Sequence, residues 1–313
     1  MLAVGGRTLL ASRDARAAVH AAREAGGTPT AWPEMTYRTL GRTGFRASRL
    51  VFGCGAALMF RPKDALLQAA YDAGINVFDV GYRGYYRNAE QHLGPFVRKV
   101  RDDVFLVSKA RVDLDAEPDE SVTVAQAKQA AASWGRRLEE SLGELGVERV
   151  DAYYLMASDN PSLIESEEVY RVFENARQAG KVAHLGLSTH RNAEKVLLAA
   201  ARTGWYDLAM IAITPGGWYG WETRSVLAGS KPMTGMKAAR HLAGLPFLGW
   251  WKQTDAFDEH YDDELLAAPL SPFQRSYAYV LAHGLDVVNA DMQSFAHLEE
   301  NVVAATTAQR DFA

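Results

Sequence analysis

From residue 35 onward the chain repeats one pattern: a short run rich in β-branched and aromatic residues, a loop, and a segment with helical periodicity. Such alternation is typical of parallel strands joined by crossover helices. Eight runs predict strands: Leu50 to Phe52, Asn76 to Asp79, Val104 to Lys109, Val150 to Met156, Val182 to Ser188, Leu208 to Ile213, Pro232 to Lys237 and Leu285 to Asn289. Eight strand–helix units in a stretch of this length predict an α/β fold of the (β/α)8 TIM-barrel type, which usually takes about 250 residues. We therefore expect one barrel over residues 35–313.

An open doubly wound sheet is the competing prediction. The glycines of Gly53-Cys54-Gly55, directly after the first strand, match the start of a dinucleotide-binding fingerprint. However, Leu58 occupies the position of the third glycine, and Pro62 opens the next helix. Because the third glycine gives close helix–strand packing in that fold, the sequence favours the barrel.

Residues 1–34 differ from the rest because they are rich in alanine, arginine and glycine. Arginines interleaved with alanines predict an amphipathic helix from about Arg13 to Glu24, and the breaker Gly26 to Thr30 follows it. We interpret this stretch as a helical N-terminal extension of the barrel. A targeting peptide is the weaker alternative, since Asp14 and Glu24 interrupt the positive charge and an apolar core is absent.

Composition excludes several classes of partner. The formal net charge of −4 and the pI near 6.1 lack the basic excess that a phosphate backbone attracts, so we expect no nucleic acid partner. No apolar run approaches the roughly 20 residues that would cross a bilayer. A single cysteine, Cys54, allows no internal disulfide and fits a reducing compartment, so we expect a cytoplasmic protein. Histidine spacing predicts no metal site, which leaves a small-molecule substrate, with oligomerisation open.

Two charged residues stand at strand ends, where barrels carry their reactive groups. Asp79 and Lys109 each follow directly on an apolar, buried strand. A buried charge must be paired or functional. A Lys–Asp pair beside a tyrosine would lower the pKa of the phenol and make it a proton donor or acceptor. A plain buried ion pair is the alternative.

Six segments occur in a characteristic order: Tyr37 to Gly44, Ala73 to Asp79, Arg101 to Lys109, Glu140 to Asp151, Gly180 to Ser188 and Leu298 to Asn301. Over residues 36–305 this set resembles the aldo-keto reductases. The resemblance implies a barrel that opens with a β-hairpin, and an NADP(H)-dependent carbonyl reductase with an Asp, Tyr, Lys and His tetrad.

The tetrad implied by the resemblance is altered in this chain. Asp79 and Lys109 match the family positions, but the tyrosine position holds Gly84. Tyr82, Tyr85 and Tyr86 surround Gly84, and Tyr85 is our first choice for the catalytic phenol. Methionine occupies the position of the family histidine, at Met156, and a thioether cannot donate a proton.

Loss of that donor affects the expected rate. The tyrosine and the histidine together stabilise charge on the carbonyl oxygen, and one lost donor typically costs about 3 kcal/mol. His190, two residues past Ser188, could replace the missing histidine. A loop histidine at the barrel rim is the alternative.

Cofactor positions are altered as well. Asp291 stands where the resemblance places a 2′-phosphate, so like charge would favour NADH over NADPH, or exclude any dinucleotide. The other candidate cofactor residues are Ser188, Lys237, Gln293, Glu300 and Asn301. Lys237 could instead meet a substrate carboxylate or form a plain ion pair.

Two glycine-containing loops are unusually aromatic and follow the sixth and seventh predicted strands. They predict the wall of a pocket for an aromatic or apolar substrate, or alternatively loop packing or an oligomer contact. The candidate pocket residues are Cys54, His190, Trp218, Trp221, Trp250 and Trp251. For Cys54 a buried structural role is favoured over that of a nucleophile, because no neighbouring base supports a thiolate.

The sequence therefore predicts an NAD(P)H-dependent reductase of an aromatic or apolar carbonyl compound. The altered tetrad leaves a second hypothesis, a barrel that performs redox-neutral acid–base chemistry as a lyase, isomerase or cyclase without a nicotinamide cofactor. A third hypothesis is a catalytically inactive binding barrel.

Overall fold

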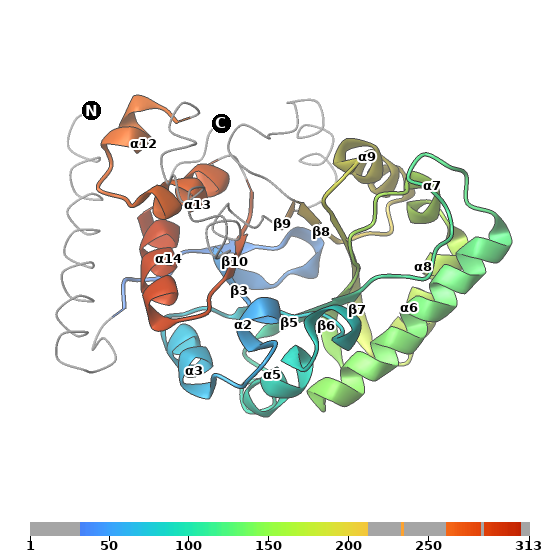
Figure 1. The fold of residues 1–313 in the computed structure, drawn as a ribbon, viewed down its shortest axis with the longest axis horizontal. Helices are drawn as coiled ribbons and strands as arrows, with labels where there is room; N and C mark the ends of the chain where they lie inside the picture. The colour runs from blue at the N-terminus through green and yellow to red at the C-terminus, as the bar shows by residue number, and fades with distance from the viewer. Residues whose placement is uncertain (1–31, 212–232, 235–260, 283–284, 308–313) are drawn as a thin grey trace.

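The computed structural model describes residues 32–211, 233–234, 261–282 and 285–307 (Figure 1). A hairpin opens this part of the chain: β1 (Tyr37–Thr39) pairs antiparallel with β2 (Arg46–Ser48). Between them lies the 3-10 turn η1 (Gly41–Thr43), which ends at Gly44 with a φ of 68°. This hairpin was predicted, and it is confirmed. The predicted helix from Arg13 to Glu24 lies outside the described residues.

Eight parallel strands form one sheet in the order β10-β3-β4-β5-β6-β7-β8-β9. Their bounds are β3 (Leu50–Gly53), β4 (Val77–Asp79), β5 (Phe105–Ala110), β6 (Val150–Leu155), β7 (Val182–Thr189), β8 (Leu208–Ile211), β9 (Met233–Thr234) and β10 (Val288–Asp291). The last strand in the chain pairs with the first of the eight, so the sheet curls round on itself with helices outside it (Figure 1). The predicted (β/α)8 barrel is confirmed.

The last strand begins and ends later than the expected Leu285 to Asn289. Its register on β3 fixes the shift, because Asn289 lies opposite Val51 and Asp291 opposite Gly53. As a result, Asn289 lies inside the strand and Asp291 is its last residue.

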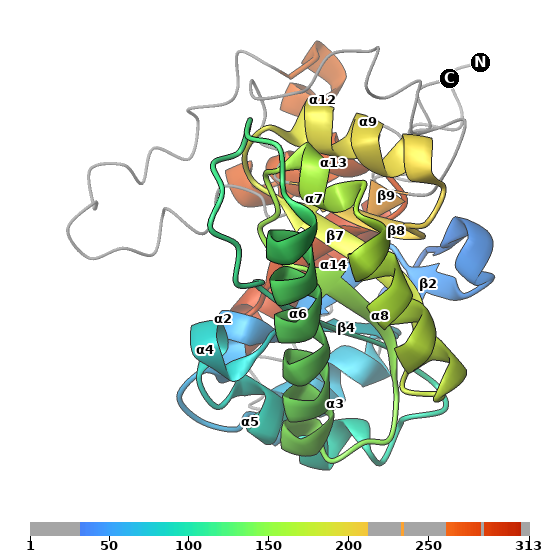
Figure 2. The ribbon, with the colours of Figure 1, turned by 90° about the vertical axis from the view of Figure 1, so that its right-hand side faces the viewer.

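Helices cover the outer face of the sheet. Their bounds are α2 (Cys54–Leu58), α3 (Asp64–Asp72), α4 (Arg83–Tyr86), α5 (Ala89–Val97), α6 (Val124–Leu145), α7 (Pro161–Ile164), α8 (Glu167–Gln178), α9 (Ala193–Thr203), α12 (Asp263–Ala267), α13 (Pro272–Ala282) and α14 (Phe295–Thr307). The long helix α6 runs beside α8 (Figure 2), and a capping box between Thr123 and Gln126 starts it. None of the helices in the described ranges has the length and apolarity to cross a membrane.

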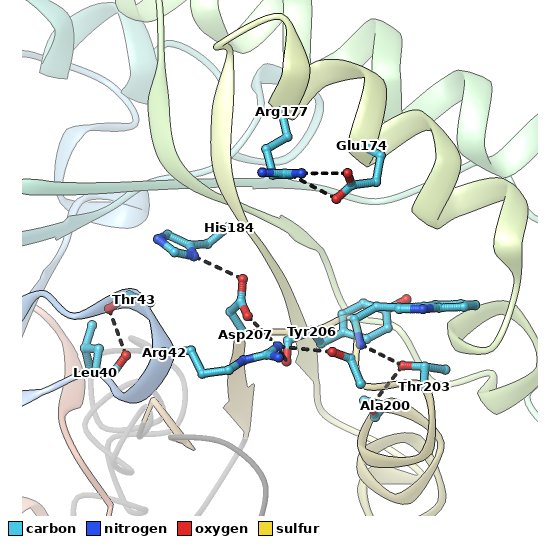
Figure 3. A network of polar contacts seen from close by, with 12 residues as sticks. Leu40, Arg42, Thr43, Glu174, Arg177, His184, Ala200, Thr203, Tyr206 and Asp207 are labelled. Atoms are coloured by element: carbon cyan, nitrogen blue, oxygen red, sulfur yellow. Dashed lines mark hydrogen bonds and ion pairs between the residues drawn. The ribbon is translucent and has the colours of Figure 1, made fainter.

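The hairpin closes one end of the barrel. Leu40 and Ala47 of the hairpin pack in one core cluster with inward residues of the barrel: Val51, Val77, Phe105, Val107, Ala152, Tyr154, Leu208 and Val287. From the hairpin turn, the Arg42 guanidinium lies 2.5 Å from Asp207 Oδ1 and donates to Gly204 O at 3.1 Å. His184 Nδ1 lies 3.0 Å from the other carboxylate oxygen of Asp207 (Figure 3). The open end of the barrel is therefore the one at which the parallel strands finish.

Candidate active site

At the carboxyl ends of the strands lies a cavity of about 370 Å³, part of it open to solvent. Among the described residues its lining consists of Asp79, Tyr86, Lys109, Met156, Ser188, Thr189, His190, Met210, Ile211 and Asn289. The structure thus brings together side chains from five different strands and the segments that follow them.

Strand periodicity explains why these side chains meet. Side chains alternate between the two faces of a strand, so every second residue points into the barrel. On β5 the inward series runs from Phe105 and Val107, which belong to the inner core, to Lys109. The same alternation leads from Val287, directly before β10, to Asn289 within β10. The earlier residues of each series fill the barrel interior, and the last residue of each series lines the cavity.

Asp79 and Lys109 form a buried ion pair, each with 4% of its surface exposed. The Lys109 ammonium lies 2.5 Å from both carboxylate oxygens of Asp79 and donates to Val80 O at 2.8 Å. Asn289 Nδ2 donates to Asp79 Oδ2 at 2.6 Å. A charged pair taken out of water is tolerated when such hydrogen bonds satisfy it.

Tyr86, and not Tyr85, faces this pair. The Tyr86 side chain is buried and lines the cavity, whereas Tyr85 is 46% exposed and does not appear in the described lining. Both residues lie on α4, where consecutive residues point about 100° apart, so only one of them can face inward. Tyr85 was our first choice from the sequence; the structure places Tyr86 in the lining beside the ion pair instead, and the catalytic role of either phenol stays a prediction. No signal in the sequence fixed the rotation of this one-turn helix.

The Tyr86 phenol is held in its protonated form. Burial, reinforced by the negative charge of Asp79, raises the pKa of Tyr86. The Lys109 ammonium lies 5.8 Å from the centroid of the Tyr86 ring. The sequence predicted a lowered phenol pKa. In the structure burial raises the pKa, because the phenolate would lose its hydration, and this effect outweighs the positive charge of Arg111. Tyr86 is therefore suited to donating a proton.

Met156, a predicted site residue, lies on the cavity wall with 7% of its surface exposed. Its thioether adds apolar surface to the lining, as do Met210 and Ile211. Ser188 Oγ accepts a hydrogen bond from the Ala157 backbone N–H at 3.0 Å, and its hydroxyl lies on the same wall. His190 is exposed at the edge of the cavity.

The candidate cofactor residues near the C-terminus lie beyond the described lining of the cavity. Gln293 Nε2 donates to Asp291 Oδ2 at 2.8 Å, while Asp291 Oδ1 is buried and has no hydrogen-bond partner among the described residues. Glu300 accepts a hydrogen bond from Ser271 Oγ. Asn301 is fully buried on α14, and within the described ranges neither polar atom of its amide has a partner.

Cys54, a predicted pocket residue, does not appear in the described lining. Cys54 begins α2 and is fully buried, and burial raises the pKa of its thiol well above the ordinary value. It contacts Phe52 O at 3.4 Å and is a structural residue here, not a pocket residue. Five other candidates lie outside the described residues: the cofactor candidate Lys237 and the pocket candidates Trp218, Trp221, Trp250 and Trp251.

Asn289, Met210 and Thr189 were missed as site residues by sequence reasoning. For Asn289 and Met210 a signal was present: each lies two positions after an inward-facing core residue, Val287 or Leu208, on a strand with period-2 alternation. Thr189 ends β7 beside Ser188, and its Oγ1 donates to Arg191 O at 2.6 Å.

A sequence model of the Aldo/keto reductase family matches residues 55–214. Among curated proteins, a Schizosaccharomyces pombe protein named "putative aryl-alcohol dehydrogenase" is 26% identical over 208 residues. The matched stretch covers 56% of this chain and 57% of that protein, so it spans little more than half of the relative.

Solved structures share the fold. An aldo-keto reductase from Klebsiella pneumoniae, in complex with NADPH, superposes with a TM-score of 0.63 at 21% identity, over 87% of this chain and 89% of its own. The holo form of an aldo-keto reductase from Bacillus halodurans gives a TM-score of 0.62 at 19% identity, over 87% and 91% of the two chains.

Proposed function

Because this chain belongs to the aldo/keto reductase family, we propose that it reduces a carbonyl compound with a nicotinamide cofactor. The observation that carries the proposal is the placement of Tyr86 against the buried pair of Lys109 and Asp79, all three facing one cavity. The cofactor would supply the hydride that adds to the carbonyl carbon.

Tyr86 would supply the proton. As the carbonyl carbon is reduced, negative charge develops on the oxygen, and a positioned hydroxyl stabilises that charge and then protonates it. The raised pKa of Tyr86 keeps the phenol protonated over the ordinary pH range. Lys109 opposes the charge that remains on the phenol oxygen, and Asp79 holds Lys109 in place.

Met156 leaves the oxygen with fewer donors. Apart from Tyr86, the described lining offers the hydroxyl of Ser188 and the exposed ring of His190 as donors that a substrate could reach. One missing donor typically lowers the rate by about 10²- to 10³-fold. We therefore expect slow turnover compared with a site that carries a histidine at position 156.

The chemistry of the C-terminal residues fits a dinucleotide with a free ribose hydroxyl. Asp291 Oδ1 is a buried acceptor without a partner among the described residues, and carboxylates in dinucleotide sites accept from the ribose 2′-hydroxyl. A 2′-phosphate beside this carboxylate would be repelled. The amide of Asn301, which has no partner among the described residues, is a second candidate contact, together with Ser188 and Gln293. NADH is therefore the favoured cofactor, although the Klebsiella pneumoniae neighbour was solved with NADPH.

An aromatic or apolar carbonyl compound is the favoured substrate. Met156, Met210 and Ile211 make one side of the cavity apolar. The name of the Schizosaccharomyces pombe relative, an aryl-alcohol dehydrogenase, agrees with this class. The predicted tryptophan loops would extend the same apolar wall.

Met156 also favours a second candidate function. A cavity with Asp79, Lys109 and Tyr86 but without the histidine retains an acid and its supporting charges for redox-neutral chemistry on an aromatic compound. This candidate needs no dinucleotide, so cofactor binding separates the two.

The first experiment is titration of the purified protein with NADH and, separately, NADPH, followed by nicotinamide fluorescence. Micromolar binding of NADH and consumption of NADH in the presence of 4-nitrobenzaldehyde are the expected results. Absence of binding of either nucleotide up to millimolar concentration would overturn the reductase and direct attention to redox-neutral chemistry.

A further inference from the structure

The carboxylate of Asp79 is held from two sides. Lys109 approaches it from β5, the neighbouring strand, while Asn289 reaches it from β10, two strands away on the other side. Asn289 Nδ2 donates to Asp79 Oδ2 at 2.6 Å, and the side chains of both residues are buried, with 4% exposure each. The opposite amide orientation would set the amide oxygen against the carboxylate, so the charge of Asp79 fixes which end of Asn289 faces it.

The contact has to cross the strand that separates β10 from β4. That strand is β3, and its residue at the crossing point is Gly53, which is paired with Asp79 on one side and Asp291 on the other. A Cβ atom on Gly53 would lie 2.8 Å from Asn289 Oδ1 and 2.8 Å from Ala290 O. Only a residue without a side chain leaves room for the Asn289 amide to pass over β3.

The Asn289 amide lies in the barrel interior, where an unpaired polar group destabilises the fold because it has lost its hydrogen bonds to water. Its bond to Asp79 satisfies one donor position, and Met210 Sδ lies 3.5 Å from the same nitrogen. An apolar residue would fill this space without needing a partner. The hydrogen bond to Asp79 therefore explains why a polar side chain occupies position 289.

We propose that Asn289 is a positioning residue that, through the space left by Gly53, fixes the Asp79 carboxylate so that Lys109 stays against Tyr86. This inference rests on the proposed reductase function. Asn289 acts through Asp79 and not on the substrate. Without its amide, Lys109 would be the remaining partner of Asp79 Oδ2 among the described residues, and the carboxylate and the ammonium would be able to turn together away from the phenol.

The kinetic test is Asn289→Leu, which keeps the volume and removes the donor. We expect kcat for 4-nitrobenzaldehyde to fall roughly tenfold to hundredfold, as for other small misplacements of catalytic groups, with KM for NADH unchanged. Asn76→Leu is the matched control, because the Asn76 amide donates to Arg46 O at the other end of the barrel. An Asn289→Leu enzyme with the same kcat as Asn76→Leu would overturn the positioning role.

The contact itself is tested without turnover by Asn289→Asp. This isosteric variant sets a second carboxylate against Asp79. The other titratable groups near the two carboxylates are Lys109, Tyr86, Cys54, His190 and Asp291. Like charges at that distance raise the pKa of one of the two carboxyl groups in the folded protein. The variant therefore loses stability as the pH rises and this carboxyl group ionises. We expect the loss in urea midpoint, relative to the wild type at the same pH, to grow from pH 5 to pH 8.

The two tests give separable failures. A pH-independent loss in Asn289→Asp would overturn the contact with Asp79 and the inference with it. A pH-dependent loss in a protein that binds no nicotinamide cofactor and reduces no carbonyl would support the contact, overturn the proposed function, and remove the positioning role together with that function.

Discussion

The rings of Tyr85 and Tyr86 meet edge to face with their centroids 4.7 Å apart, yet only the Tyr86 ring lines the cavity. The Tyr85 ring lies under the guanidinium of Arg111 at 5.3 Å and is exposed, whereas the Tyr86 ring lies beside Lys109 in the cavity. Two chemically identical neighbours thus differ in their surroundings, one lining the cavity and the other exposed at the surface.

This arrangement predicts that Tyr86→Phe lowers kcat for carbonyl reduction by about 10²- to 10⁴-fold, because the phenol that donates the proton is lost. Steady-state kinetics at saturating NADH measure the effect, and fluorescence titration shows whether the variant still binds the cofactor. Tyr85→Phe removes a hydroxyl one residue away and should leave kcat within about twofold. The reverse result would return the proton donor to Tyr85.

Much of the site could be predicted from the sequence because its residues continue apolar strand patterns. Asp79 and Lys109 each follow a buried run, so their position at the barrel mouth followed from the alternation of strands and helices. The same alternation contains Asn289, but the predicted strand ended there, and its register on β3 decides that it points inward. Register depends on pairing between distant segments, which local pattern does not encode.

Other parts of the site depend on details that the sequence pattern does not hold. Whether Tyr85 or Tyr86 faces Lys109 depends on the rotation of the one-turn helix α4. The direction of the pKa shift of Tyr86 depends on a balance between burial and charge, and the sequence offered only the charges. Both are results of tertiary packing.

Met156→His should raise the rate of carbonyl reduction by about 10-fold or more, because it returns a second hydrogen-bond donor to the cavity wall. Met156 lines the cavity, so the imidazole would face the same space as Tyr86. Met156→Leu is the matched control for the change in shape and should keep roughly the wild-type rate. If Met156→His is no faster than Met156→Leu, the missing histidine does not limit this enzyme.

Asp291→Asn should reverse the preference between the two nicotinamide cofactors. Removal of the negative charge relieves the repulsion of a 2′-phosphate, so NADPH should bind about tenfold tighter or better, while NADH loses a charged acceptor for its ribose hydroxyl. Competitive fluorescence titration with the two cofactors measures the ratio. Asp102→Asn makes the same charge change at an exposed turn and should leave the ratio unaltered. A ratio unchanged in Asp291→Asn would place the phosphate elsewhere.

Glu90 predicts a pH dependence of stability that is independent of catalysis. It is 1% exposed on α5 and accepts a hydrogen bond from Ser108 Oγ at 2.6 Å, and burial raises its pKa to about 7. Because the folded pKa lies above that of the unfolded chain, the protein binds more protons when folded, and Glu90 costs stability progressively as the pH rises from about 4.5 to above 7.

Glu90→Gln keeps the acceptor for Ser108 and removes the titration. We expect this variant to unfold at a higher urea concentration than the wild type at pH 8, by a free energy on the order of 1–3 kcal/mol, and to differ little at pH 5. Ser108→Ala is the matched control, since it deletes the hydrogen bond but leaves the carboxyl group; it should retain the pH dependence. If Glu90→Gln loses as much stability between pH 5 and pH 8 as the wild type, Glu90 does not cause the pH dependence, and its carboxyl group is ionised in the folded protein at an ordinary pH.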